Sequence, residues 1–344
     1  MTSDNLRVAI GPTNVAGQGY QIARSLREIK NIDAINFMLN NNSFRFKTDL
    51  SVPSEGWITS LTKAIGGRAD YWPEIDFRSH VLTEYFDAFR NRNGIRSWSL
   101  DTKVSQEQGQ VVGVIAHGSD VRVPSIHSEL DELSPHRKLG KSYNALLEQI
   151  TKRNIENSEL ADACFVSTRD LLHFLPNATW LPAIVDSELF GTPLPTPSNR
   201  PVVLHLPSDP RFKGSEYIVP VLEKLHQSGV IRYRSMLASS HDQVLRAINH
   251  AHILVDQIGV GHYGAISVEA MASGRIVMAY MGNLGAGEPI VNIRPETIEE
   301  ELVTLASDLE LQARTFKLSR EFAEKFHNGN ASVKALEPFL NLSK

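Results

Sequence analysis

The sequence of 344 residues contains a single cysteine, Cys164, so it cannot form an internal disulfide. Such a composition is typical of a reducing compartment. No apolar run approaches the ~20 residues that a membrane-spanning helix needs, and the first residues lack the basic and apolar stretches of a secretory signal. We therefore predict a cytoplasmic protein, either free or held peripherally at the inner face of the membrane.

An excess of positive charge is also absent. Lys and Arg number 35 and Asp and Glu number 39, and the formal net charge of −4 argues against nucleic acid as the main partner. The sequence has no clustered His, Cys and Asp at metal-ligand spacing, so no metal is expected. What is present, 42% hydrophobic and 22% charged residues, is ordinary for a globular protein and enough for two domains of ~150 residues.

The sequence also lacks a clear dinucleotide fingerprint. The apolar strand expected at 6–10 is followed by a turn with Gly11, Gly17 and Gly19 and then by helical periodicity, which predicts a Rossmann-like βα unit. The spacing is not G-x-G-x-x-G, because Ile22 takes the place of the third glycine. A nicotinamide-dependent oxidoreductase therefore stays only as an alternative that shares the fold class.

The most informative stretch is 251–280. An apolar strand at 253–255 precedes a glycine-rich turn, a helix at 265–273 that Gly274 ends, and a second strand at 276–280. This order predicts a βαβ crossover. Its turn lies outside the carboxyl end of a strand, where open α/β sheets bind ligands.

Glu269 is out of place on this otherwise apolar helix. A buried carboxylate is costly unless it meets a donor, and the hydroxyls of a ligand diol would be suitable donors. A solvent-exposed position is the other interpretation. The unpaired N–H groups at the start of the helix suit anionic or hydroxyl-rich ligands.

These residues resemble a known signature. Tyr263-Gly264 followed by Glu269-Ala-Met-Ala and Gly274 is similar to the donor site of retaining GT-B glycosyltransferases, close to glycosyltransferase family 4. The resemblance implies an α/β fold with two Rossmann-like domains facing across a central cleft. It also implies that Glu269 binds the ribose of a nucleotide sugar and that neighbouring residues hold the sugar, namely His262, Tyr263, Gly264 and Ala265. The first glutamate of the family pattern falls at Gly261 and is missing.

Two cations, Arg211 and Lys213, lie just before a helix that starts near Ser215. They would repel each other and the helix dipole, which is reasonable if a pyrophosphate lies between them. The alternative is a pair of exposed surface cations. Lys213-Gly214 resembles the Lys-Gly of the family's diphosphate site, with Arg211 as the nearest substitute for an arginine that the family carries earlier.

Polar residues of the first half also point to the cleft. By resemblance, the turn with Gly17 and Gly19 faces the leaving phosphate. His117, directly after the strand at 111–116, belongs to a His-Gly-Ser-Asp loop that is similar to the family's and would reach the donor sugar. Alternatively, His117 caps its own turn. Asp120 and Arg122 either pair with each other or, in the case of Arg122, contact an acceptor.

The expected organisation is an acceptor-side domain at 1–190, a proline-rich linker at 191–201, a nucleotide-sugar domain at 202–318 and a last helix at 319–344 that crosses back. Residues 40–110 give no clear pattern beyond a helix-like stretch at 81–90. The basic run at 134–141 is either a solvated loop or a contact for anionic lipid.

The predicted reaction is transfer of a sugar from a UDP-, GDP- or ADP-sugar to an acceptor hydroxyl, with retained anomeric configuration and without a cofactor. The acceptor would be a glycan, a lipid-linked precursor or a small molecule. The family's first glutamate, which falls at Gly261, and the arginine that the family carries before the Lys-Gly pair are both missing here. A nucleotide-sugar-binding protein without turnover is therefore the main alternative.

Overall fold

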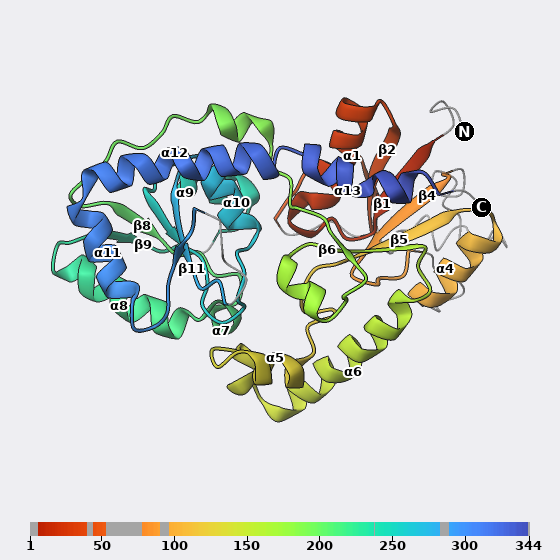
Figure 1. The fold of residues 1–344 in the computed structure, drawn as a ribbon, viewed down its shortest axis with the longest axis horizontal. Coiled ribbons are helices and arrows are strands. Elements are labelled where there is room, and N and C mark those ends of the chain that lie inside the picture. Colours follow the sequence, from red (N-terminus) through yellow and green to blue (C-terminus); the bar gives the residue numbers. More distant parts are fainter. Residues whose placement is uncertain are drawn as a thin grey trace.

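The computed structural model describes residues 6–39, 44–52, 78–89, 96–236, 238–282 and 289–342. Two parallel β-sheets, each covered by helices, form two domains that lie side by side (Figure 1). All of the strand pairs are parallel, as the apolar strand patterns predict for a buried α/β sheet.

The first domain holds a seven-stranded sheet in the order β3-β2-β1-β4-β5-β6-β7. Its strands are β1 (Arg7–Gly11), β2 (Asp33–Leu39), β3 (Leu50–Val52), β4 (His80–Glu84), β5 (Val111–Ala116), β6 (Ala163–Val166) and β7 (Thr179–Trp180). The strand order reverses between β1 and β4, and the carboxyl ends of these two neighbours therefore form the topological switch point of the sheet.

Helices cover both faces of this sheet. They are α1 (Gln18–Lys30), α4 (Trp98–Glu107), α5 (Pro124–Leu130) and α6 (Lys141–Ser158), with short 3₁₀ turns η2 (Val15–Gly17), η3 (Pro135–Arg137), η4 (Arg169–His173) and η5 (Ser187–Gly191). Alternate residues of each strand enter two different cores: Val8 and Ile10 pack with α1, whereas Ala9 packs with Trp98 of α4. This alternation explains why the strands are apolar throughout.

The second domain holds a five-stranded sheet in the order β12-β11-β10-β8-β9. Its strands are β8 (Val202–Leu204), β9 (Arg232–Arg234), β10 (Ile253–Val255), β11 (Ile276–Ala279) and β12 (Val291–Asn292). Its helices are α7 (Pro210–Lys213), α8 (Ser215–Gln227), α9 (His241–Asn249), α10 (Ala265–Ala272), α11 (Ile298–Ser307) and α12 (Leu309–Phe326). Here the switch point lies between β8 and β10.

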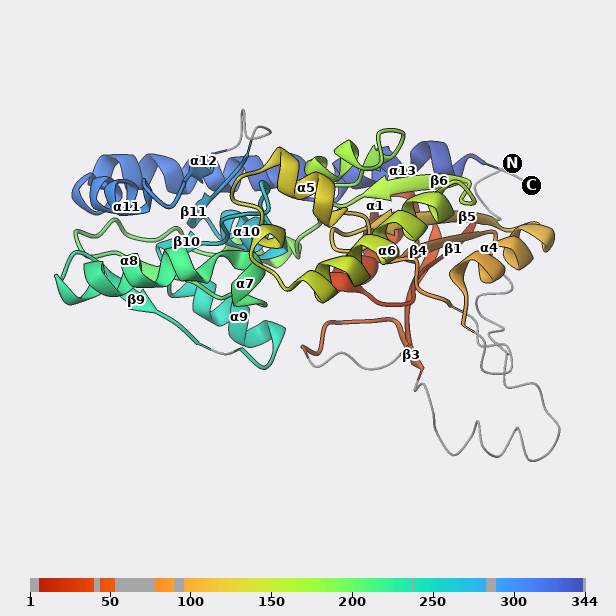
Figure 2. The same cartoon turned by 90° about the horizontal axis from the view of Figure 1, so that it is seen from below.

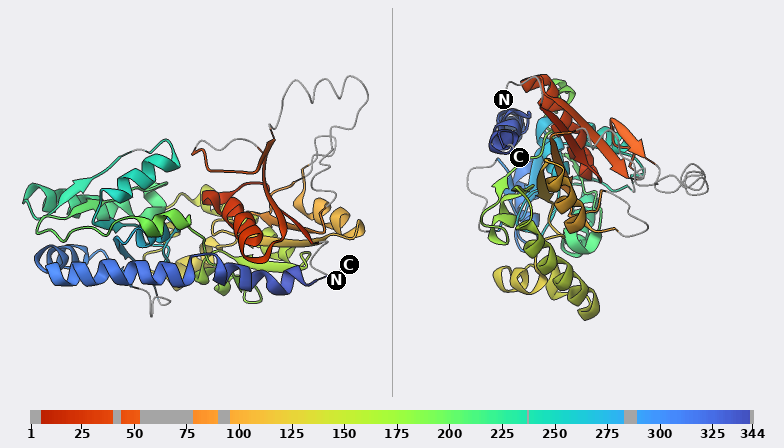
Figure 3. Two further views of the ribbon diagram at one scale, coloured as in Figure 1. Left: turned by 90° about the horizontal axis from the view of Figure 1, so that it is seen from above. Right: turned by 90° about the vertical axis from the view of Figure 1, so that its right-hand side faces the viewer.

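The chain returns to the first domain at its end. Helix α12 packs against α10, and α13 (Asn330–Leu340) packs against α1 and places Phe339 in the first core. The two helices follow one another along one side of both domains (Figures 1 and 2). The views in Figure 3 show the same arrangement from above and from the end. The turn between these helices is at 327–329, later than the expected crossing after 318.

One prediction of secondary structure is wrong. The helix-like stretch at 81–90 contains strand β4, because its apolar residues are buried on both faces of a central strand rather than along one helical stripe. The stretch at 40–110 also contains the aromatic residues Trp57, Tyr71 and Trp72, which lie outside the described residues. Among the helices of the described chain, none combines the length and apolar character that crossing a membrane requires.

Candidate active site

The loops after β8 and β10 meet at the switch point of the second sheet. Lys213, at the end of α7, directs its Nζ to the Asp256 Oδ1 at 2.6 Å. Gly214, with φ of +68°, follows Lys213, and a Cβ there would come within 2.5 Å of the Ile258 carbonyl oxygen. Only glycine at position 214 permits this close approach of the two loops, and the approach positions the neighbouring Lys213.

Asp256 is the residue of this cluster that the sequence did not reveal. Its carboxylate is fully enclosed and accepts hydrogen bonds from the Gly264 amide at 2.9 Å and the Ser267 hydroxyl at 2.7 Å, besides the Lys213 ammonium. Burial alone would raise the pKa of Asp256, but Lys213 and these hydrogen bonds outweigh it and lower that pKa below its usual value. Asp256 thus joins Lys213 to the start of α10.

Glu269 lies one helical turn further along α10 and is not exposed on the surface. Its Oε1 is 2.5 Å from Nε2 of His241, the first residue of α9. Lys213, Ala265 and Glu269 together line one cavity of about 390 Å³. The structure therefore brings the predicted phosphate-binding lysine, the helix start and the predicted ribose-binding carboxylate to a single pocket.

The His241–Glu269 pair predicts a pH-dependent stability. Burial would lower the pKa of His241, but the hydrogen bond and charge of Glu269 raise it above the ordinary 6.5. A raised folded-state pKa means that the pair's contribution is complete below about pH 6.5 and is lost as the pH rises through the folded-state value. We expect the stability difference between wild type and His241→Asn in urea unfolding to shrink from pH 6 to pH 9. A difference that stays constant with pH would contradict this assignment.

Arg211 does not join this pocket. Its guanidinium forms two hydrogen bonds with the carboxylate of Asp209, at 3.1 and 2.7 Å, and lines a different cavity together with Lys138 and Glu216. Asp209 is the N-cap of α7, and it draws the arginine back to its own turn. The prediction that Arg211 and Lys213 flank one phosphate is therefore not supported, and we remove Arg211 from the proposed site.

The glycine turn between β10 and α10 lies between the domains. His262, Tyr263, Gly264 and Ala265 line a cavity of about 160 Å³ together with His117 and Ala16 of the first domain. The Gly264 amide is already used by Asp256. Gly261, where the family's first glutamate falls, has φ of +75°, and Asp131 of the first domain places Oδ2 3.6 Å from the position of its missing Cβ.

In the first domain, Asp120 and Arg122 do not pair with each other. The Asp120 carboxylate accepts the amides of His117 and Gly118 at 2.7–3.1 Å, and burial raises its pKa. Arg122 instead forms an ion pair with the buried Asp170. Asp120 therefore holds the His117 loop, whereas Arg122 joins this loop to η4, and their acceptor-side roles stay predictions.

Glu84, at the end of β4, is a second buried carboxylate that the sequence did not reveal. It is 0% exposed, accepts the amides of Asn14 at 2.7 Å and Val15 at 3.1 Å, and lies 3.3 Å from Nε2 of His117. This carboxylate thus holds the β1–α1 turn and lies close to His117, whose Nε2 makes no hydrogen bond among the described residues. The turn after β5 is capped by the Asp120 carboxylate and not by the His117 ring.

The two predicted glycines of this turn differ. Gly17 has φ of +75° and packs against Phe46, which lines the same cavity as Lys213 and Glu269. Gly19 is buried in the first turn of α1, where a Cβ would lie 2.5 Å from the Asn36 side-chain nitrogen and 3.1 Å from Glu84. Because protein atoms fill its surroundings, we remove Gly19 from the donor-binding set.

Glu84→Ala is expected to destabilise the fold. Two backbone amides would lose their acceptor, and each buried donor left unpaired costs ~1–3 kcal/mol, which gives a loss of roughly 2–6 kcal/mol in the free energy of unfolding. Urea unfolding measures this loss, with Glu107→Ala at the exposed end of α4 as the matched control. Equal stability of the two variants would show that Glu84 does not hold the turn.

The basic run at 134–141 lies at the domain interface. Lys138 binds Glu216 at 2.8 Å and Tyr217 at 2.5 Å in the second domain, and His136 packs its ring against Phe212. Arg137 donates to the carbonyl oxygens of Ser128 and Asp131. The contacts of Lys138 and His136 join the two domains. The cations Arg137, Lys138 and Lys141 are nevertheless exposed, as the solvated-loop interpretation expects, and the lipid contact stays a prediction.

Comparisons with known proteins place this geometry in a fold. No protein-family model matches the sequence, and no curated protein sequence is similar to it. Among solved structures, an alpha-glucosyltransferase in complex with UDP and a 13-mer DNA is similar with a TM-score of 0.60 and 11% identity, over 98% of this chain and 100% of that one. Sucrose-phosphate synthase from Thermosynechococcus elongatus is similar with a TM-score of 0.58 and 14% identity over 97% of both chains.

A trehalose-6-phosphate synthase, studied for glycosyl transfer with retention, is similar with a TM-score of 0.58 and 9% identity over 99% of this chain and 100% of that one. These likenesses extend across both domains, although the identities are too low to carry residue roles or substrates. The prediction from the α10 motif is thus confirmed at the level of architecture: the chain has the GT-B fold, with two Rossmann-like domains facing each other.

Proposed function

We propose that the protein transfers a sugar from a nucleoside diphosphate sugar to an acceptor hydroxyl, with retention of anomeric configuration. One observation carries the proposal: Lys213, Glu269 and the start of α10 line a single pocket at the switch point of the second sheet. An ammonium suits the diphosphate, a carboxylate suits the ribose hydroxyls, and a helix start suits either.

The remaining wall of this pocket suits a nucleobase. It is mostly apolar and includes Phe44, Phe46 and Met236. The Phe46 ring lies 4.8 Å from the ring of His241, and the His241 amide donates to the Phe44 carbonyl oxygen at 3.0 Å. Aromatic rings provide stacking surface for bases without selecting one of them, so uridine, guanosine and adenosine diphosphates are all candidates.

Charge development explains how these groups would accelerate the reaction. As the glycosidic bond breaks, the leaving diphosphate gains negative charge, and a cation placed beside it stabilises the transition state more than the ground state. Lys213 would supply that cation, held in place by Asp256. The cavity of about 160 Å³ lined by His117, His262 and Ala265 adjoins the donor pocket and would hold the transferred sugar.

A thermal-shift comparison of UDP, GDP, ADP and NAD tests the first step. Stabilisation by a nucleoside diphosphate and not by NAD is expected, since a ligand that binds only the folded state raises the melting temperature. Stabilisation by NAD alone would favour the oxidoreductase alternative. A transfer assay with the corresponding radiolabelled sugar donor and a panel of glycan, lipid-linked and small-molecule acceptors then separates a transferase from a protein that only binds the donor.

A further inference from the structure

We propose that the acceptor is a small hydroxyl-bearing molecule with a phosphate or carboxylate group, bound in a second pocket at the switch point of the first sheet. That the ligand is an acceptor rests on the proposed function, whereas the pocket and its charged side chains are independent of it. The sequence motif does not assign this pocket.

The position of the pocket follows from the topology. A cavity of about 420 Å³ is lined by Pro12 and Thr13, which follow β1, and by Phe86 and Asp87, which follow β4. These strands are the neighbours at which the strand order of the first sheet reverses. Crevices outside the carboxyl ends of strands at such a point are where open α/β sheets bind ligands.

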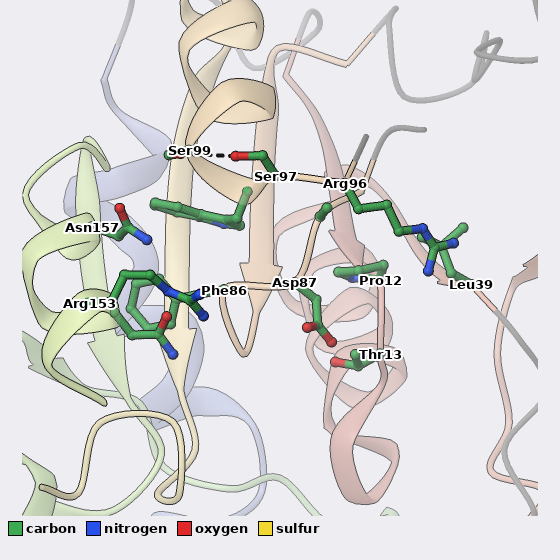
Figure 4. Close-up of a pocket in the computed structure, with 13 residues that line it drawn as sticks. Pro12, Thr13, Leu39, Phe86, Asp87, Arg96, Ser97, Ser99, Arg153 and Asn157 are labelled. Atoms are coloured by element: carbon green, nitrogen blue, oxygen red, sulfur yellow. Dashed lines mark hydrogen bonds between the residues drawn. The ribbon is translucent and has the colours of Figure 1, made fainter. Parts of the chain in front are cut away.

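Charged side chains give the pocket its specificity. Figure 4 shows Arg96 and Arg153 on opposite sides, with Asp87 between them. Among the described residues neither guanidinium makes an ion pair, and both are exposed. Guanidinium groups bind phosphate and carboxylate through paired hydrogen bonds. The start of α4 at Trp98 and Ser99 also lines the cavity and favours an anion on the same side as Arg96.

Other groups suit a hydroxylated ligand. The Asp87 carboxylate can accept hydrogen bonds from hydroxyl groups. The Thr13 hydroxyl is shielded from solvent and has no hydrogen-bond partner among the described residues. Phe86 and Trp98 pack edge to face, with ring centroids 5.1 Å apart, and give one wall an apolar surface. A sugar-like molecule with one acidic substituent satisfies these groups together.

The pocket is also close to the proposed donor site. Thr13 lines the proposed anion-binding pocket, and Ala16 lines both cavities of the proposed donor site. Three residues of chain span at most ~11 Å, and the turn between them is held by Glu84. A hexose-sized ligand in the first pocket can therefore present a hydroxyl toward the transferred sugar.

Isothermal titration calorimetry of the full chain tests the inference, with glucose 6-phosphate, glucuronate and glucose as probes, each with and without UDP. We expect one or both anions to bind at least about tenfold more tightly than glucose, and Arg96→Gln and Arg153→Gln each to weaken that binding about tenfold or more. Lys103→Gln, an exposed cation on α4 outside the pocket, is the matched control and should bind as wild type does.

Each outcome decides the inference. Preference for the phosphate or for the carboxylate would support it and identify the acidic group. Failure of both anions to bind wild type, equal affinity for glucose, or full affinity in both arginine variants would overturn it. If no nucleotide binds but anion binding still depends on the two arginines, the proposed transferase function fails while the anion site stands.

Discussion

Lys213→Ala is expected to lower turnover by more than ~100-fold, the effect of removing one charge donor that acts on the transition state. The ammonium lies at the cavity shared with Glu269, and Asp256 holds it there at 2.6 Å. Because the developing charge on the leaving diphosphate is larger in the transition state than in the bound donor, the loss should fall mainly on kcat. Steady-state kinetics with the donor identified by thermal shift measures it.

The variant needs a stability control, because Asp256 would be left as a buried charge without its partner. Removing one member of a buried ion pair typically costs ~3–5 kcal/mol. The double variant Lys213→Ala with Asp256→Asn removes both charges and should recover most of the melting temperature while turnover stays low. Near-wild-type turnover in the folded double variant would reject a catalytic role for Lys213 and with it the proposed transferase mechanism.

Local sequence patterns predicted the framework of this site. The strands β5 and β10 match the expected ranges, 111–116 and 253–255. These predictions succeed because a short apolar run that forms a buried parallel strand is recognised from neighbouring residues alone. The convergence of Lys213 and Glu269 was predictable for a related reason, since both follow adjacent strands of one sheet.

Contacts between distant segments were not predictable. Asp256 and Glu84 stand directly after or within apolar strands, and nothing in their neighbourhood indicates that backbone amides and cations from other loops would satisfy them. The prediction that Arg211 joins Lys213 failed for the opposite reason: Asp209, two residues away, binds the Arg211 guanidinium. Arg96 and Arg153 of the proposed anion-binding pocket come from segments separated by more than fifty residues, so only the fold brings them together.

Glu269→Gln is expected to weaken binding of the nucleoside diphosphate by about 10–100-fold, because a hydrogen bond to a charged group contributes ~1.5–3 kcal/mol. His241 occupies Oε1 of Glu269 and fixes the carboxylate, which leaves Oε2 for a ribose hydroxyl. Calorimetry of wild type, Glu269→Gln and the exposed control Glu223→Gln separates the site from a general loss of negative charge. His241→Asn should weaken binding less, since it loosens the carboxylate without removing it. If Glu269→Gln binds the nucleotide with wild-type affinity but unfolds more easily, the carboxylate serves only to join α9 to α10.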